Sequence, residues 1–280
     1  MTDAPLTGES WRTDLFDIPA YLEALGVRPA EPTLDLLEAL HYAHVHTLCF
    51  GNVDVLFGTH PGVTPGVVQE QLVRRRRGGY CFEHAQLFAA ALEWLGFAVR
   101  RAMGRVHAVT NTRTHTTVIA ALDGSQWLCD PGFGFSVTGP IALREGATRT
   151  DHGRKFSMQR VDDHGSTLWV LLRDGQVQHY IDELTVHPGD VRTGHFITSR
   201  EPGSTFLQRL TVMRHLPEAH VTITERARTV RARGLEAVHT ELSVDEVVTA
   251  VCDVGVDLDT HEQERLAAIV SRLRRGAACR

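Results

Sequence analysis

RRRRGGYCFEHAQLF, residues 74–88, places one cysteine between an arginine cluster with two glycines and a segment of helical character. From Cys81 the apolar residues recur on one helix face, through Ala85 and Phe88, and Gly96 is a natural stop. The pattern predicts a core-facing helix with the cysteine in its first turn. Unpaired amide N–H groups and the positive end of the helix dipole stabilise a thiolate there. The stretch therefore indicates a reactive cysteine, with a small buried hydrophobic cysteine as the alternative.

The residues before this stretch predict helices. Thr33 can cap a helix whose leucines Leu34, Leu37 and Leu40 share one face. Thr64 with Pro65 starts a second helix that runs to the arginines and ends before Gly78. The N-terminal part is therefore expected to be a helical bundle.

Two basic groups in this region admit structural explanations. The run Arg74–Arg77 is typical of a charged helix end, and it also suits pairing with buried acids such as Glu83 or attraction of a phosphorylated cofactor. The i, i+2 spacing of His44 and His46 suits a strand better than a helical metal site. Neither group by itself defines a site.

After Gly96 the composition becomes that of β-strands. The Asp–Gly pairs at 123–124 and 174–175 predict tight hairpins, so the strands form an antiparallel meander that can close into a barrel. A less regular stretch, 182–208, follows. The predicted strands are 97–107, 115–122, 126–130, 155–161, 167–173 and 176–181.

The last seventy or so residues mix strands and helices. LTVMRH (210–215) and HVTITERARTVRA (220–232) have strand composition. Ser243 and Glu246 form a capping box, and a final helix begins at Thr260. Taken with the meander, these elements predict an α+β fold.

The first predicted hairpin suggests a partner for the cysteine. A two-residue turn at Asp123–Gly124 sets Thr117 opposite Asp130, which places His115 on the same sheet face and diagonal to Asp130. An acid on an adjacent strand orients an imidazole and supports its charged form. A longer turn would put the two on opposite faces, and an exposed His115 with Asp130 capping the following turn is the structural alternative. Together with Cys81 they form a Cys–His–Asp nucleophilic set.

Composition excludes several classes. A formal net charge of −5 over 280 residues argues against a nucleic-acid-binding surface, and no apolar run is long enough to span a membrane. The N-terminus lacks a signal-peptide pattern, so the cytoplasm is expected. Five scattered cysteines without a CxxC pair suggest neither a zinc ribbon nor disulfides, and no HExxH occurs, so no metal is expected. GFGFSVTG (132–139) fits neither GxGxxG nor a P-loop.

Three blocks in the same order resemble the signature of the arylamine N-acetyltransferases: RRRRGGYCFEH, then THTTV (114–118), then WLCDPGFG (127–134). Cys81, His115 and Asp130 fall on that family's catalytic Cys–His–Asp triad. The resemblance extends over roughly residues 20–275.

The resemblance implies three parts: a helical bundle carrying the cysteine (1–97), a β-barrel domain carrying histidine and aspartate (98–200), and a linker with an α/β lid (201–280). It implies ping-pong transfer from acetyl-CoA through an acetyl-cysteine to an arylamine or hydrazine, and a role in xenobiotic metabolism. A homodimer is compatible with it. By the same likeness the substrate pocket holds Phe50 and Phe206, and CoA meets Thr114, Gly132, Phe133 and Gly134.

The chain departs from the family pattern in places. Gly51 stands where the family has glutamate, Ala85 where it has asparagine, and Pro131 where it has valine. Near the site, Gly51 and Ala85 would make the pocket floor roomier or less rigid. Three alternatives stay open: an amide synthase that cyclises a carrier-bound polyketide, a Cys–His–Asp hydrolase, and a non-catalytic ligand-binding relative.

Overall fold

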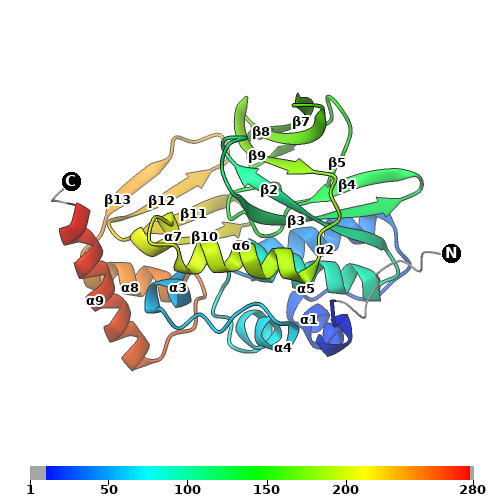
Figure 1. Ribbon diagram of the computed structural model, residues 1–280. Helices are drawn as coiled ribbons and strands as arrows, with labels where there is room; N and C mark the ends of the chain where they lie inside the picture. Colours follow the sequence, from blue (N-terminus) through cyan, green and yellow to red (C-terminus); the bar gives the residue numbers. More distant parts are fainter. Residues whose placement is uncertain (1–10, 278–280) are drawn as a thin grey trace.

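The computed structural model describes residues 11–277, and its N-terminal third is helical (Figure 1). The predicted cap at Thr33 is present, since its hydroxyl accepts the Leu36 N–H at 3.2 Å. The helix predicted from Thr64 begins at Pro65 and continues as a π-helical segment to Arg74. The elements are η1 (Thr13–Leu15), α1 (Ile18–Leu25), α2 (Leu34–Thr47), α3 (Val53–Phe57), α4 (Pro65–Val68), η2 (Gln69–Arg74) and α5 (Cys81–Trp94).

His44 and His46 lie on α2, so the preference for a strand at this pair was wrong. The His44 ring is buried between two helices, where it bonds the Tyr21 hydroxyl at 2.6 Å and the His84 ring at 2.7 Å. These contacts come from α1 and α5, so the spacing of the two histidines along the chain carried no information about them.

The central part is an antiparallel sheet in the order β5-β4-β3-β2-β9-β8-β7-β6. Its edge strands β5 and β6 come close to one another, so the sheet is nearly closed into a barrel, as expected. Asp123–Gly124 and Asp174–Gly175 have positive φ at both positions, which confirms the two tight hairpins. The strands are β2 (Ala98–Val106), β3 (Arg113–Leu122), β4 (Ser125–Cys129), β5 (Ile141–Ala142), β6 (Thr148–Asp151), β7 (Arg154–Asp163), β8 (Ser166–Arg173) and β9 (Gln176–Asp182).

The stretch expected to be irregular contains helix α6 (Pro188–Arg200) and the short α7 (Thr205–Gln208), so that expectation was wrong. Helix α6 has two glycines and little apolar periodicity. It packs instead through close approach, because a Cβ at Gly194 would lie 2.9 Å from the Phe82 ring. In Figure 1 it runs beneath the barrel strands.

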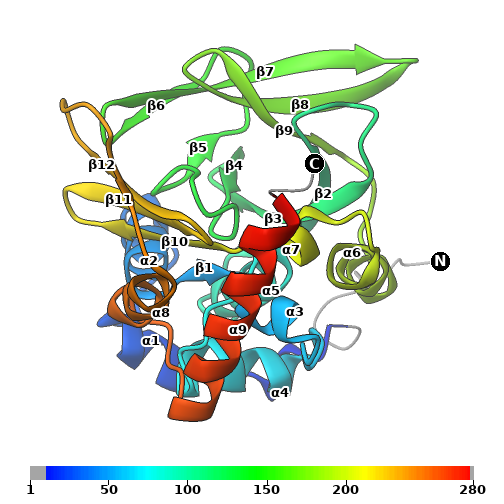
Figure 2. The same ribbon diagram turned by 90° about the vertical axis from the view of Figure 1, so that its left-hand side faces the viewer.

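The C-terminal part is a second antiparallel sheet covered by two helices (Figure 2). The segment 220–232 forms two strands, because the Thr224 hydroxyl accepts N–H groups of Arg226 and Ala227 at a turn. The elements are β10 (Thr211–Leu216), β11 (Ala219–Thr224), β12 (Ala227–Ala232), β13 (Val238–Glu241), α8 (Val244–Asp253) and α9 (Thr260–Ala277).

The predicted division into three domains stays a prediction. The 97/98 boundary falls between α5 and β2, and the 200/201 boundary falls at the end of α6. Strand β1 (Phe50–Gly51) crosses this division, since it pairs with β10 of the C-terminal sheet. Within residues 11–277, no helix has the length and apolarity to span a bilayer.

Candidate active site

Cys81 occupies the first helical position of α5, as predicted. The Glu83 carboxylate accepts the Tyr80 N–H at 3.2 Å and so closes the start of the helix. The Cys81 side chain is buried, and its Sγ faces the Thr114 carbonyl on β3 at 3.6 Å. The helix start therefore aims the sulfur at the barrel.

The loop before the cysteine is anchored by buried charge. Arg77 is 4% exposed and pairs with Asp54 at 2.6 Å and with Glu262 of α9 at 2.7 Å. Glu83 is not its partner, because that carboxylate binds His60 at 2.6 Å. Among the explanations for the arginine run, pairing with acids is thus the one that holds for Arg77.

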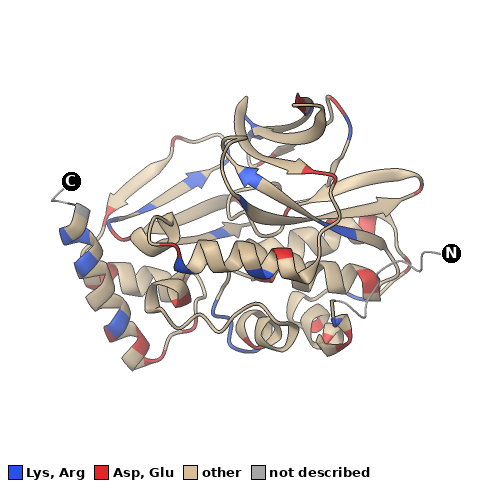
Figure 3. Ribbon diagram, viewed as in Figure 1, with Lys and Arg blue, Asp and Glu red and all other residues tan. Residues whose placement is uncertain are grey.

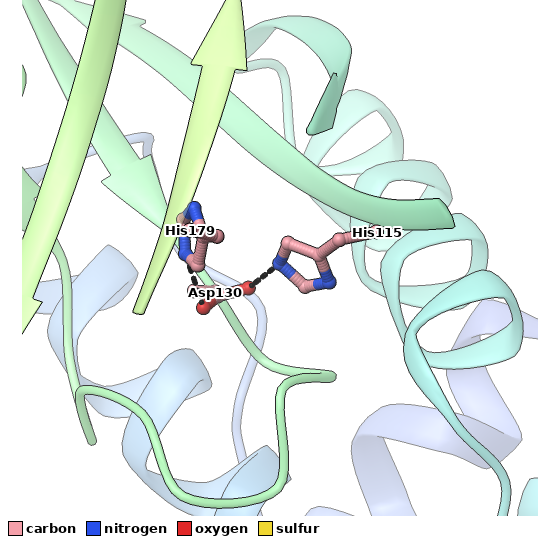
Figure 4. A group of neighbouring side chains, drawn as sticks. All are labelled: His115, Asp130 and His179. Carbon is pink, nitrogen blue, oxygen red and sulfur yellow. Dashed lines mark hydrogen bonds and ion pairs between the residues drawn. The ribbon is translucent and has the colours of Figure 1, made fainter. Parts of the chain in front are cut away.

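His115 and Asp130 meet as the hairpin register predicts. Val118 pairs with Cys129, and Asp130 follows directly at the end of β4. His115 Nε2 donates to Asp130 Oδ1 at 2.8 Å, and Figure 4 shows the two side chains facing each other. His115 is 2% exposed and Asp130 1% exposed, so the exposed-histidine alternative is excluded.

Electrostatics favour the charged form of this pair. Burial alone would disfavour an imidazolium, but the Asp130 charge and hydrogen bond, with a contribution from Cys81, raise the pKa of His115 to about 10. Burial likewise disfavours the Asp130 carboxylate, but His115 and His179 outweigh it and hold the pKa of Asp130 well below its ordinary value. The two groups form a buried ion pair.

Cys81 and His115 line one cavity of about 740 Å³. It lies between the barrel, the α6–α7 segment and the C-terminal sheet. Gly134, a predicted CoA residue, is not part of the lining of this cavity. It packs against Phe50 instead, since a Cβ added there would lie 3.0 Å from the Phe50 ring, and its φ of +85° suits glycine. The other predicted pocket and CoA residues do line the cavity: Phe50, Thr114, Gly132, Phe133 and Phe206.

A family model described as N-acetyltransferase matches residues 33–263. An arylamine N-acetyltransferase / N-hydroxyarylamine O-acetyltransferase of Salmonella typhimurium is 36% identical over 210 residues, covering 71% of this chain and 73% of the relative. The chain belongs to the arylamine N-acetyltransferase family. It is therefore an acyltransferase, and the predicted resemblance and enzyme class are confirmed.

Further comparisons cover nearly the whole chain. The arylamine N-acetyltransferase of Escherichia coli is 33% identical over 251 residues, 83% of this chain and 86% of that protein. The structure of the Mycobacterium abscessus enzyme has a TM-score of 0.88 at 28% identity, covering 95% of this chain and 99% of that one. The Mycobacterium marinum enzyme in complex with CoA has a TM-score of 0.80 at 28% identity, covering 92% and 99%.

Two members of the site in this N-acetyltransferase were missed in the sequence. His179 on β9 donates through Nε2 to Asp130 Oδ2 at 3.0 Å, and Ser136 donates to the same oxygen at 2.7 Å (Figure 4 shows the His179 bond). Burial lowers the pKa of His179 despite Asp130, so this ring is a neutral donor. No local pattern marks His179 among 16 histidines, because the barrel brings β9 to the end of β4.

The imidazoles of His115 and His179 and the Asp130 carboxylate are close enough together to suggest a metal site. Each histidine nitrogen, however, points at a separate oxygen of the same carboxylate at hydrogen-bond distance. The hydrogen bonds account for the arrangement as it stands, and the same nitrogens would have to lose their protons to bind a metal.

Two of the departures from the family pattern, Gly51 and Ala85, lie outside the lining of the cavity. Gly51 lies in β1, where a Cβ would contact the Val212 side chain at 3.4 Å, and Ala85 is fully buried in the helical core. Neither residue lines the cavity, so the condition on which a roomier pocket floor was expected is not met. The sequence could not show this because both positions depend on contacts with distant elements.

We expect Gly132→Ala to reduce both stability and acetyl transfer. A Cβ at Gly132 would lie 2.7 Å from the Cys81 Cα and 2.9 Å from the His84 Cβ, so helix α5 would have to shift. Such overpacking costs about 1–3 kcal/mol. Urea denaturation and steady-state rates measure the two effects.

Gly66→Ala is the matched control, because its added Cβ would meet no atom within 4 Å beyond its chain neighbours and its own helix backbone. A Gly132→Ala enzyme with wild-type stability and rate would show that the loop does not need glycine there.

We expect the stability that His115 contributes to fall as the pH rises. Because its folded pKa, about 10, exceeds the ordinary value of 6.5, the contribution is complete below about pH 6.5 and is lost by about pH 10. The difference in unfolding free energy between wild type and His115→Gln should therefore shrink from pH 6 to pH 10 in urea titrations. A flat profile for His115→Gln would contradict the ion pair.

Proposed function

We propose that this N-acetyltransferase carries acetyl groups from acetyl-CoA to aromatic amines or hydrazines through an acetyl-Cys81 intermediate. The observation that carries the proposal is the placement of Cys81 and His115 on one cavity, with the buried Asp130 behind His115. The CoA complex of the Mycobacterium marinum relative supports the choice of donor.

In the first half-reaction the Cys81 thiol gives its proton to His115, whose charged form is stabilised by Asp130. The sulfur attacks the thioester carbonyl of acetyl-CoA, the bond from that carbon to the CoA sulfur breaks, and an S-acetyl cysteine forms. CoA leaves as a thiol after taking the proton of the His115 imidazolium. Asp130 holds the ring in place throughout.

In the second half-reaction a neutral amine attacks the acetyl carbon. His115, now neutral, takes the proton that the amine loses, and the carbon–sulfur bond breaks to release the Cys81 thiolate and the amide. The proton count of the enzyme is thereby restored. Acetyl-CoA must react before the amine, because both half-reactions use the same cysteine.

The cavity suits a flat aromatic acceptor. The rings of Phe50 and Phe206 lie 6.2 Å apart between centroids, and the Phe133 ring lies edge-on to His115 at 5.0 Å. Aromatic walls bind a planar ring by dispersion and edge-to-face contact, which leaves the amine free to reach the cysteine. The cytoplasmic location, the homodimer and the xenobiotic role stay predictions.

The test is mass spectrometry of the intact protein after acetyl-CoA is added without acceptor. We expect one added acetyl group on the peptide that contains Cys81, and its loss when an arylamine or hydrazine is added. Acetate released without any amine would favour a hydrolase. No acetylation, with cyclisation of a carrier-like thioester bearing an internal amine, would favour the amide synthase.

A further inference from the structure

We infer that Arg173 and Arg231 form an oxyanion-binding subsite in the catalytic cavity, which takes a phosphate or carboxylate of a substrate that reaches Cys81. Both arginines line the cavity that contains Cys81 and His115. Arg173 ends barrel strand β8 and Arg231 lies on β12 of the C-terminal sheet, so the subsite joins two parts of the fold. The inference rests on the proposed function, since it concerns the substrates of the same site.

The two guanidinium groups gather around one aromatic ring. The Cζ atom of Arg173 lies 4.2 Å from the centroid of Phe135, and that of Arg231 lies 5.5 Å from the same centroid. Phe135 is two residues beyond Phe133, whose ring touches His115. One short loop thus connects the catalytic imidazole to the arginine pair.

The Asp174 charge acts partly against that of Arg173, but no ion pair neutralises either guanidinium group within the described residues. Within residues 11–277 neither Arg173 nor Arg231 pairs with a carboxylate, and the adjacent Asp174 binds Arg154 at 3.1 Å. Figure 3 shows acidic and basic residues interspersed over the ribbon in that view. Burial and the repulsion of nearby arginines lower the pKa of both groups. A bound anion would offset this repulsion.

Each guanidinium keeps donors for a ligand. Arg173 uses Nη1 to bind the Phe135 carbonyl at 2.8 Å, and Arg231 uses Nη1 to bind the Thr222 hydroxyl at 3.1 Å. These neutral acceptors orient the two planes but leave most of the five N–H donors of each group unused. Half-buried, oriented guanidinium forks are the geometry that binds phosphate or carboxylate through two parallel bonds.

Two substrates could supply the anion, and enzyme assays with Arg173→Gln and Arg231→Gln distinguish them. One arm compares acetyl-CoA with S-acetylpantetheine, which lacks the phosphates. The other compares 4-aminobenzoate with the neutral 4-aminobenzamide as acceptor. In one of the two arms, we expect each variant to raise the KM of the anionic substrate, acetyl-CoA or 4-aminobenzoate, by about tenfold or more. The kcat and the KM of the matching neutral substrate should stay nearly unchanged.

Control variants separate binding of the anion from general damage. Arg173→Lys should recover part of the loss because it keeps a charge. Arg160 also lies over an aromatic ring, with its Cζ 5.9 Å from the Trp169 centroid, but it does not line the cavity. Arg160→Gln should therefore leave the KM values in both arms unchanged. Equal effects on charged and neutral substrates, or no effect in either arm, would overturn the subsite.

Calorimetric titration of CoA and of pantetheine, and of 4-aminobenzoate and 4-aminobenzamide, reports on the subsite even if Cys81 accepts no acetyl group. If the arginine variants lose affinity for the anionic ligand and not for the neutral one, the inference holds even where the proposed function fails. Unchanged affinity for both anions in an enzyme that does acetylate Cys81 rejects the inference and leaves the proposed function standing.

Discussion

Cys81→Ser is expected to leave the protein folded and to reduce acetyl transfer by at least about 10⁴-fold. Serine fits the same small buried position at the start of α5. Its hydroxyl does not ionise near neutral pH, so the imidazolium of His115 has no anion to stabilise and no nucleophile forms. The measurements are kcat/KM with acetyl-CoA and an arylamine, and circular dichroism to show that the fold persists.

The other described cysteines provide the controls. Burial raises the pKa of Cys49 to about 11 and also raises the pKa of Cys129 and of Cys252, so none of them offers a thiolate at pH 7. Substoichiometric iodoacetamide should therefore label Cys81 before these three, and Cys252→Ser should keep wild-type activity. Inactivation that follows labelling of Cys49 or Cys129 would reject Cys81 as the nucleophile. Cys279, the fifth cysteine, lies outside the described residues.

Asp130→Asn should be nearly as damaging, with a loss of about 10³- to 10⁴-fold in kcat/KM. The carboxylate accepts hydrogen bonds from both His115 and His179 and holds the charge that favours the His115 imidazolium. An asparagine keeps the shape but removes the charge, and its amide group would favour the wrong tautomer of His115. Steady-state rates and the rate of Cys81 alkylation at pH 7 should fall together.

Ser136→Ala is the matched control for this change. It deletes one hydrogen bond to Asp130 Oδ2 and leaves the charge in place, so the loss should stay within about tenfold. Combining Asp130→Asn with Cys81→Ser should add little to the effect of either, because the groups act as one unit. Additive losses would show that Asp130 and Cys81 act independently, and a folded Asp130→Asn enzyme with near wild-type rates would show that Asp130 has no role in transfer.

The helical, barrel and C-terminal parts of the fold meet at this site, and each contributes different side chains to it. The helix start of α5 offers the sulfur, the hairpin of β3 and β4 offers the oriented imidazole, and β1 with α7 brings the aromatic walls. Arg77 binds both Asp54 and Glu262, so the loop before Cys81 is fastened to the C-terminal helix α9.

The sequence alone determined the features that depend on neighbours in the chain. The position of Cys81 in the first turn of α5 follows from the glycines before it and the apolar period after it. The pairing of His115 with Asp130 follows from the two-residue turn at Asp123–Gly124, because strand alternation carries the register of a turn along the whole hairpin.

The tertiary structure decided everything that depends on contacts between distant segments. His179 joins Asp130 because the barrel curls β9 over the end of β4, and helix α6 forms where its own sequence carries little apolar pattern, because Gly194 can approach Phe82. Arg173 and Arg231 meet at Phe135 from two different sheets. The local periodicity of a sequence indicates which face of a helix or strand is buried. Which neighbouring segment covers that face depends on tertiary packing, and at this site those neighbours supply His179 and the arginine pair.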